Sequence, residues 1–179
     1  MSDTTLREIT LDHAMIARVC RLRVLAWRTQ ADIPAQVEEW RDLQDSDARH
    51  WAICLGEDPV AAVRLTIHTD LTTVPDGDVY RATLPHGLET PIASYNRMVV
   101  RPDMRRRGFS RMLDDVSIAA ARDMGARCLV GITGSVHGNQ HRVDAMVRRG
   151  FEPLRAAFAP TQLPYSPEMV PTVLVMRLS

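Results

Sequence analysis

The segment from Arg97 to Ser110 carries the residue types that best fit a chemical role. An apolar, strand-like run passes through a short basic loop and a glycine into the start of a helical pattern. Backbone N–H groups at a helix N-terminus lack intrahelical partners and, with the helix dipole, favour phosphate groups. Gly108 permits close approach of the backbone, and flanking arginines supply charge-assisted hydrogen bonds. The segment predicts a phosphate-binding loop; the alternative is a solvated basic turn that caps a helix.

The composition places this basic segment in a protein that is otherwise close to neutral. The chain has 179 residues, with 22 basic and 22 acidic side chains, and every basic residue is an arginine. The absence of lysine excludes covalent catalysis by a lysine amine. Residues 97–111 contain six arginines and one aspartate, a net charge of +5. Such a patch indicates a compact anionic partner rather than general attraction to nucleic acid.

Cysteine usage and hydropathy indicate the compartment. No apolar run is long enough for a membrane span, and the first residues show no secretory signal pattern. The three cysteines are widely spaced and odd in number, which predicts reduced thiols in the cytoplasm and no metal-ligand pattern. They are Cys20, Cys54 and Cys128. We therefore expect a cytoplasmic protein without a metal.

Hydrophobic periodicity and turn residues predict one α/β domain over residues 1–179. Strands are expected at residues 5–10, 51–55, 60–68, 92–100, 128–133, 151–158 and 173–178. Helices are expected from an Asp12 N-cap to Trp27, at 108–124 and at 139–149, with a short helix opening at Ile33-Pro34 and another short helix or a loop within 69–91. A strand–helix–strand unit between hairpins predicts a mixed, mostly antiparallel central sheet flanked by helices.

The basic segment resembles the pyrophosphate loop of the Gcn5-related N-acetyltransferases, the GNAT family. That loop reads Q/R-x-x-G-x-G/A after a strand that often ends in V-x-P. Here Val100-x-Pro102 is followed by Arg105-x-x-Gly108-x-Ser110. Downstream, the family often shows an asparagine that opens a helix ending in Gly-Phe, and here ten residues separate Asn139 from Gly150-Phe151. The resemblance is strongest over residues 92–156, and Ser110 in place of Gly or Ala is its small departure in the loop.

The resemblance implies transfer of an acetyl group from acetyl-CoA to an amine of a small molecule or peptide. In the family, backbone groups of the strand before the loop contact the pantetheine arm, and N–H groups of the loop contact the pyrophosphate. An asparagine past the next strand also touches the cofactor. The matching positions here are Met98, Val99, Val100, Arg105, Arg106, Arg107, Gly108, Phe109, Ser110 and Asn139.

The acid and the base that many GNAT relatives use are missing from this chain. A tyrosine that protonates the leaving thiolate is replaced by Met146, and a glutamate base is absent near Ser94. Ser94 and Asn96 share one strand face and could hold a water that relays a proton. His137 lies near the expected thioester and has a suitable ordinary pKa. These three are candidates only, so the catalytic groups stay unassigned and positioning of the reactants is the main expected source of rate.

Three other functions remain open from the sequence. The first is long-chain N-acyl transfer, because the chain is also similar to N-acyl amino acid synthases and autoinducer synthases. That similarity rests on Arg21-Leu22-Arg23, Asp45, His50-Trp51 and Arg64-Leu65. The second is a non-catalytic CoA-binding module, suggested by the missing acid and base. The third is nucleic-acid binding, which is disfavoured because the basic patch is short and has few interleaved aromatics.

Further polar and aromatic residues in the N-terminal third are interpreted mainly as structural. Asp45, Asp47 and His50 have a weak metal-ligand spacing, and a turn before a strand explains them better. Three tryptophans could line an apolar acceptor pocket, but core packing is expected for at least two of them. They are Trp27, Trp40 and Trp51. As partners we expect an amine acceptor, no nucleic acid and no membrane, and we leave a homodimer open.

Overall fold

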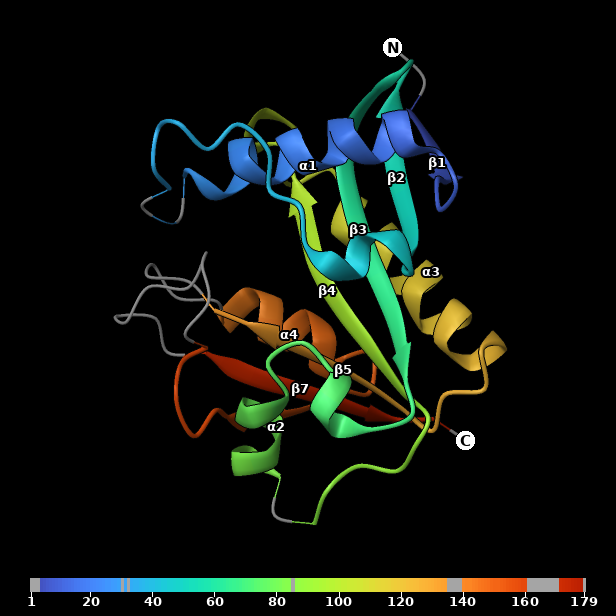
Figure 1. Cartoon of the computed structure of the whole chain (residues 1–179), viewed down its shortest axis with the longest axis vertical. Helices are drawn as coiled ribbons and strands as arrows, with labels where there is room; N and C mark the ends of the chain where they lie inside the picture. Colours follow the sequence, from blue (N-terminus) through green and yellow to red (C-terminus); the bar gives the residue numbers. More distant parts are fainter. Residues whose placement is uncertain are drawn as a thin grey trace. The chain divides into compact units, whose positions relative to one another are not determined.

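The computed structural model describes residues 4–29, 31, 33–84, 86–134, 140–160 and 171–178. The chain forms two interleaved compact units, Met1–Thr66 with Tyr95–Ala119, and Ile67–Ser94 with Ala120–Ser179. Their elements are labelled in Figure 1. The strands are β1 (Thr4–Glu8), β2 (Arg49–Leu55), β3 (Asp58–His68), β4 (Ile92–Val100), β5 (Cys128–Thr133), β6 (Glu152–Arg155) and β7 (Thr172–Arg177). The helices are α1 (His13–Trp27), α2 (Gly77–Thr83), α3 (Phe109–Asp123) and α4 (Gln140–Val147).

The first unit packs α1 on strands that neighbour one another in the order β1, β2, β3, β4. β1 and β3 both run antiparallel to β2, with Ala52 opposite Ala62. The Asp12 side chain begins α1 by accepting a hydrogen bond from the N–H of Met15 at 2.9 Å, as predicted. Small side chains on the covered face of the strands, among them Ala52 and Ala62, share one buried core with α1 residues such as Val19. They leave room for the helix to lie close to the sheet.

The segment after α1 differs from the sequence prediction. We expected a helix opening at Ile33-Pro34, but residues 33–42 contain only turns and extended chain. The segment is held by partners outside itself. The Arg28 guanidinium donates to two of its carbonyl oxygens at 2.9 and 2.8 Å, and the N–H of Trp40 donates to the carbonyl of Cys20 at 3.0 Å. Val37 and Trp40 do pack against the core of this unit, as predicted.

The second unit contains the parallel part of the sheet. Ile92–Ser94 of β4 pair in parallel with Cys128–Val130 of β5, whereas β7 runs antiparallel to both β5 and β6. Valines of β5 and β7 share a buried core with Val79 and Tyr80 of α2. The buried side chains of α4 are Val143 and Met146. This unit therefore builds its own core from β-branched strand residues and short helices.

The predicted fold class, a mixed and mostly antiparallel sheet flanked by helices, is confirmed. The β6 strand is shorter than the predicted 151–158. The N–H of Ala156 still donates to the carbonyl of Pro171 at 3.2 Å, and the N–H of Ala157 then donates to the Thr83 hydroxyl at 3.0 Å. The single domain over residues 1–179 stays a prediction. No helix in the described part of the chain has the length and hydropathy needed to cross a membrane.

Candidate functional site

The predicted phosphate loop is an open turn in the first unit. A 3-10 turn, Pro102–Met104, follows β4, and α3 begins at Phe109. Gly108 has φ +82° and is exposed, and a Cβ built on it would meet no atom within 4 Å. Arg106 is also left-handed, with φ +64°. The N–H of Arg101 anchors the start of the turn by donating to the carbonyl of Val60 on β3 at 2.8 Å. The loop backbone at Gly108 is therefore open to a ligand.

Several arginines of the basic segment are already engaged within the protein. Arg101 pairs with Asp103 at 2.7 Å. The Arg105 guanidinium donates to the carbonyl of Ala26 at 3.2 Å and to the hydroxyl of Thr29 at 2.8 Å, so it ties the loop to the end of α1. The side chain of Arg105 thus holds the loop in place. Its N–H also lies 3.5 Å from the carbonyl of Pro102.

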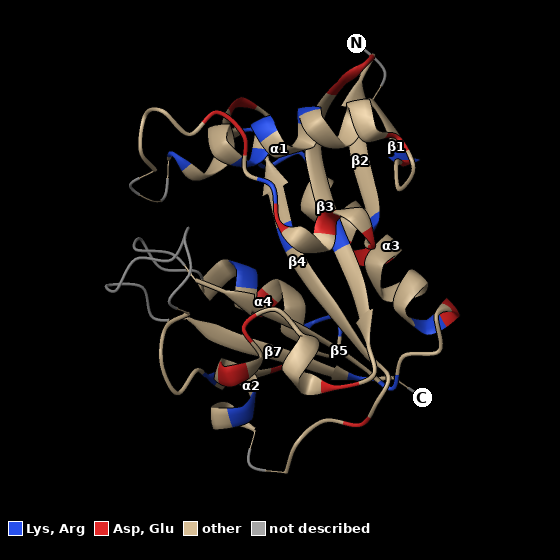
Figure 2. Cartoon of the chain, in the orientation of Figure 1, with Lys and Arg blue, Asp and Glu red and all other residues tan. Residues whose placement is uncertain are grey.

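Arg106 and Arg107 are the two exposed arginines that the loop offers to a ligand. Among the described residues, neither makes a hydrogen bond or an ion pair within 4.0 Å. Arg111 lies beside Asp115 at 3.9 Å, one helical turn away. Figure 2 shows acidic and basic residues interspersed along the ribbon of the chain. The positive charge available to a ligand at this loop therefore comes from Arg106 and Arg107, beside Gly108.

The other predicted cofactor contacts lie before and after this loop. Met98, Val99 and Val100 are the last three residues of β4, whose backbone groups alternate between its two edges. Their assignment to the pantetheine arm stays a prediction. Asn139 and His137 lie outside the described residues. The structure therefore places the loop and the strand of the predicted site and leaves those two residues as sequence-based predictions.

The polar residues of β4 are engaged in the protein interior. Ser94 is 1% exposed. The Asn96 side-chain oxygen accepts a 2.6 Å hydrogen bond from Nε of Arg64. On the opposite face of the strand, the Tyr95 hydroxyl donates to Asp114 of α3 at 2.6 Å, a buried contact that the sequence did not reveal. Asn96 thus orients an arginine, and the water-relay role of Ser94 and Asn96 stays a prediction.

β4 is interrupted at Arg97, which has φ +56° within the strand. A left-handed conformation is strained for a residue with a side chain, and such strain often marks a functional position. The Arg97 guanidinium donates to both carboxylate oxygens of Asp42, at 2.6 and 3.1 Å. Its Cζ atom also lies 5.5 Å from the centre of the Trp27 ring, in cation–π range. The irregular backbone therefore aims this side chain at the segment before β2.

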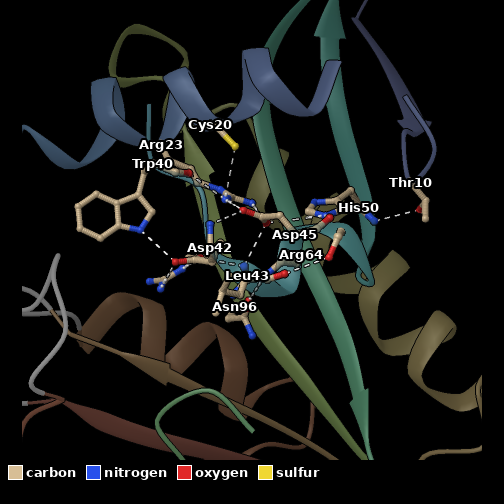
Figure 3. Close-up of polar contacts among 12 residues, drawn as sticks. Thr10, Cys20, Arg23, Trp40, Asp42, Leu43, Asp45, His50, Arg64 and Asn96 are labelled. Carbon is tan, nitrogen blue, oxygen red and sulfur yellow. Dashed lines mark hydrogen bonds and ion pairs between the residues drawn. The ribbon is translucent and has the colours of Figure 1, made fainter. Parts of the chain in front are cut away.

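Asp42 belongs to a larger buried network of charges, shown in Figure 3. Arg23 of α1 donates to both oxygens of Asp45, at 2.7 and 2.8 Å. Arg64 of β3 bridges the two aspartates, with Nη1 2.8 Å from Asp42 and 3.0 Å from Asp45. The side chains of Arg23, Arg64 and Asp45 are no more than 2% exposed. Four separate segments of the first unit thus meet in one network.

The strand register explains why the network forms. Arg64 lies directly opposite His50 across β2 and β3, on the same face as Ala52 and Ala62. That face packs on α1, which supplies Arg23. Asp42 and Asp45 come from a capping box around a 3-10 turn, in which the N–H of Asp42 donates to Asp45 at 2.8 Å. The network is therefore built by pairing on the sheet and by a local turn.

The network is ionised at neutral pH, with a neutral histidine beside it. Burial raises the pKa of Asp45, but the hydrogen bonds and charge of Arg23 outweigh it and hold this pKa well below its usual range. Burial also opposes ionisation of Asp42, yet Arg97 and Arg64 lower its pKa. Burial lowers the pKa of His50, whose Nε2 lies 3.1 Å from the carbonyl oxygen of Asp45.

The sequence pointed to part of this network and missed the rest. The similarity to N-acyl amino acid and autoinducer synthases named Arg23, Asp45, His50 and Arg64, and the structure brings these four together. Asp42 was missed, although its capping-box spacing to Asp45 is a recognisable signal. Arg97 was counted with the basic segment, because nothing in a strand pattern indicates a left-handed residue.

The interpretation of the N-terminal polar residues as structural is supported. Asp47 is exposed, and the Asp45 carboxylate is occupied by arginines. No group of three metal-ligating side chains is found in the described ranges. Trp51 is 4% exposed and Trp27 is 9% exposed, so both belong to the core. Trp40 is partly buried and meets Trp27 edge-on, with ring centres 5.6 Å apart.

Comparison with solved structures shows which proteins share this fold. The AHL synthase LasI has 18% identity over 100% of this chain and 92% of its own, with a TM-score of 0.66. FeeM, an N-acyl amino acid synthase from uncultured soil microbes, has 11% identity over 99% and 92%, with a TM-score of 0.67. A GNAT-family acetyltransferase of Staphylococcus aureus Mu50 has 12% identity over 99% and 100%, with a TM-score of 0.62. At these identities the likeness concerns the fold alone.

Sequence comparison identifies the family. No curated protein matches the chain. A family model described as "Acetyltransferase (GNAT) family" matches residues 16–151, which is most of the chain and includes β4, the open turn and α3. The acyl-CoA-dependent N-acyltransferase activity predicted from the loop motif agrees with that family. The chain therefore belongs to the acetyltransferase (GNAT) family and is an acyl-CoA-dependent N-acyltransferase.

Proposed function

We propose that this protein binds acyl-CoA along Met98–Val100 and the loop Arg105–Ser110, and transfers the acyl group to an amine. The pyrophosphate lies against Gly108, with Arg106 and Arg107 as its charged partners. The observation that carries this proposal is the open, left-handed turn at Gly108, placed directly before a 15-residue helix and beside two exposed guanidinium groups. Each part favours a bound phosphate, and the turn, the start of the helix and both arginines lie within the first unit.

The helix start supplies the hydrogen-bond donors. The N–H of Met112 donates to the carbonyl of Gly108 at 3.2 Å, which is the first intrahelical bond of α3. The N–H groups of residues 109–111 precede this bond and have no acceptor within the helix. A glycine at the turn lets an anion approach these donors without a side chain in the way. Asn139 is proposed as a further cofactor contact, on the family resemblance alone.

The reaction requires little proton chemistry from the protein. The amine nitrogen attacks the thioester carbonyl carbon, the C–N bond forms, the C–S bond breaks and CoA leaves as a thiolate. A thiol has a pKa of about 8.5, so its thiolate is a fair leaving group without a proton donor. The proton lost by the amine passes to water or to a group not yet assigned. Met146 cannot donate a proton and is buried, so rate enhancement rests on positioning of the reactants.

The donor that the family favours is acetyl-CoA, and we propose it as the first substrate to test. A longer acyl donor is the second candidate. It is supported by the network of Arg23, Asp45 and Arg64, residues that the sequence linked to N-acyl amino acid and autoinducer synthases. LasI, an AHL synthase, and FeeM, an N-acyl amino acid synthase, belong to the same two groups of enzymes. The cytoplasm is the proposed location, because the three cysteines are free and buried thiols.

A turnover assay tests the proposal. The protein is incubated with acetyl-CoA, and in parallel with longer acyl-CoAs, in the presence of a panel of amines while free CoA thiol is measured. We expect thiol release that depends on the amine, and the preferred chain length decides between the two donors. The Arg106→Gln/Arg107→Gln double variant should raise KM for acyl-CoA, whereas Arg122→Gln, on the exposed surface of α3, should not. Tight CoA binding without thiol release from any amine would contradict an enzymatic role.

A further inference from the structure

The buried network contains more positive than negative charge. Its cations are Arg23, Arg64 and Arg97, and its anions are Asp42 and Asp45, which leaves one positive charge in excess. The neighbouring His50 does not balance it, because burial lowers its pKa and favours the neutral ring. Charges removed from water are normally paired, since an unpaired buried ion is costly. The described network is therefore electrostatically incomplete.

The two carboxylates of the network are already fully used as acceptors. Asp45 accepts two bonds from Arg23, one from Arg64 and one from the backbone N–H of Asp42. Asp42 accepts bonds from Arg64, from Trp40 and twice from Arg97. A carboxylate offers about four lone-pair sites. Neither aspartate has room for the remaining guanidinium donors.

Three guanidinium nitrogens of the network lack a hydrogen-bond partner among the described residues. One of them is the buried Nε of Arg23. Another is Nη2 of Arg64, which has no hydrogen-bond partner although it is buried together with the rest of the side chain. Nε and Nη2 of Arg97 bind Asp42, and among the described residues its Nη1 has no partner. The two guanidinium groups stand side by side, because both donate to the same Asp42 oxygen, Oδ2, at 2.8 and 2.6 Å. Among the three arginines of the network Arg97 is the one that reaches solvent, so its free Nη1 and the one excess positive charge match a carboxylate ligand.

The network reaches solvent on the side of Arg97. The Arg97 and Asp42 side chains are 11% and 14% exposed, whereas Arg23, Arg64 and Asp45 are closed off. Arg97 also holds its strained backbone conformation on β4, three residues before the end of the strand proposed to hold the pantetheine arm. A ligand that enters at Arg97 therefore meets the same strand as the acyl donor. Water could satisfy a hydrogen bond at this position but would leave the charge unbalanced.

We propose that Arg97, backed by Arg64, binds a carboxylate of the acceptor, so that the acceptor is an amine that also carries a carboxylate. This inference rests on the proposed acyltransferase function and narrows its substrate class. Arg97 acts as a specificity-determining residue that contacts the acceptor. Arg64, which shares Asp42 with Arg97, adds positive charge beside it and is itself oriented by Asn96. The reaction balance is unchanged, because the carboxylate takes no part in bond formation or cleavage.

The test uses the wild-type enzyme, so a folding defect cannot affect the result. It compares turnover of matched pairs of acceptors. Each pair consists of an L-amino acid and its carboxamide, with the same acyl-CoA and at fixed ionic strength. We expect kcat/KM to be at least about tenfold higher for the acid than for the amide, because removing the anion removes a charge-assisted pair. Equal kcat/KM for acid and amide across the panel would overturn the inference and leave the proposed function intact. Absence of thiol release with every amine would instead count against the proposed function.

Substitutions of Arg97 test whether this residue causes the preference for acid over amide acceptors. Arg97→Gln should raise KM for acid acceptors about tenfold or more, so that the ratio of kcat/KM for the acid to that for its amide falls toward one. Arg97→Lys should restore part of the preference, because it keeps the charge without the planar fork. Arg122→Gln is the control for the loss of one arginine. If folded Arg97→Gln, verified by circular dichroism, still prefers acids as strongly as wild type, Arg97 is not the binding residue and the proposal fails.

Discussion

Met146 occupies the position where many GNAT relatives carry a proton-donating tyrosine. Its side chain is 1% exposed at the end of α4, so it is part of the protein interior. Residues that match positions of the family motif therefore have two different structural roles. One kind fills the core, and the other kind, such as Arg106 and Arg107, is exposed beside an open turn. Substitutions at each kind should change different measurements.

Truncation of Met146 should affect stability rather than chemistry. Met146→Ala removes buried side-chain volume, and we expect the free energy of unfolding to fall by about 2–5 kcal/mol. Met146→Leu conserves volume and should cost less than about 1.5 kcal/mol. Urea denaturation measures both, and kcat is compared at a temperature where both variants are folded. A specific loss of kcat in folded Met146→Ala would show that our account of the missing acid is wrong.

His50 should make the stability depend on pH. Burial lowers its pKa in the folded state, so the unfolded chain takes up a proton first as the pH falls. The free energy of unfolding should therefore decrease as the pH falls from about 6.5 toward the folded-state pKa, with a slope of at most about 1.4 kcal/mol per pH unit. His50→Gln should flatten this slope between pH 7 and 5, whereas His13→Gln, an exposed control, should keep it. Equal slopes in His50→Gln and wild type would refute the prediction.

Protonation of the two aspartates belongs to a lower pH window. The pKa of Asp42 and that of Asp45 are both depressed in the folded state, burial being outweighed by the arginines. Their contribution is complete above the unfolded-state pKa of about 3.9 and is lost as the pH falls below it. Asp45→Asn leaves Arg23 and Arg64 buried without their shared anion, and should destabilise the protein by about 3–5 kcal/mol at pH 7. Calorimetric unfolding at pH 7 measures this loss, and a change below 1 kcal/mol would contradict the network described above.

At the scale of elements, the turn before α3 is defined by one backbone conformation. Gly108 has φ +82°, so any side chain there strains the backbone even though the space is open. Gly56, in the turn between β2 and β3, is a matched control with φ +61° and equally open space. Gly108→Ala and Gly56→Ala should each lower the free energy of unfolding by about 1–2 kcal/mol. Only Gly108→Ala should also weaken CoA binding in calorimetry, and equal CoA affinity in the two variants would argue against the loop.

The elements also show what could be predicted from sequence. β4 and β5 have the predicted bounds, because Pro102 ends the first strand and Gly125 precedes the apolar run of the second. The prediction of a helix in segment 33–42 was wrong. The conformation of this segment depends on hydrogen bonds to Arg28 and Cys20, which lie outside the segment and are not part of its local pattern. The loop motif could be found from the chain alone. The charge network could not be predicted in full, since the direction of the Arg97 side chain depends on a left-handed backbone conformation within β4.

At the scale of the whole molecule, equal numbers of acidic and basic residues leave no long-range field for nucleic acid. Binding of CoA should therefore depend on local charge. We expect CoA affinity to fall moderately as salt rises from 0.05 to about 0.5 M, because exposed guanidinium–phosphate contacts are screened. CoA should bind more tightly than dephospho-CoA if Arg106 or Arg107 reaches the 3′-phosphate. Titration with duplex DNA at about 0.15 M salt is the control, and tight sequence-independent binding of DNA would contradict this view.

The central claim is that the loop Arg105–Ser110 holds acyl-CoA, and titration calorimetry of CoA tests it most directly. Wild type, Arg106→Gln/Arg107→Gln and Arg122→Gln are compared at the same salt concentration, after unfolding curves show that all three are folded. We predict that the double variant binds CoA at least about tenfold more weakly, whereas Arg122→Gln binds as wild type does. CoA affinity that is unchanged in the folded double variant would contradict the claim.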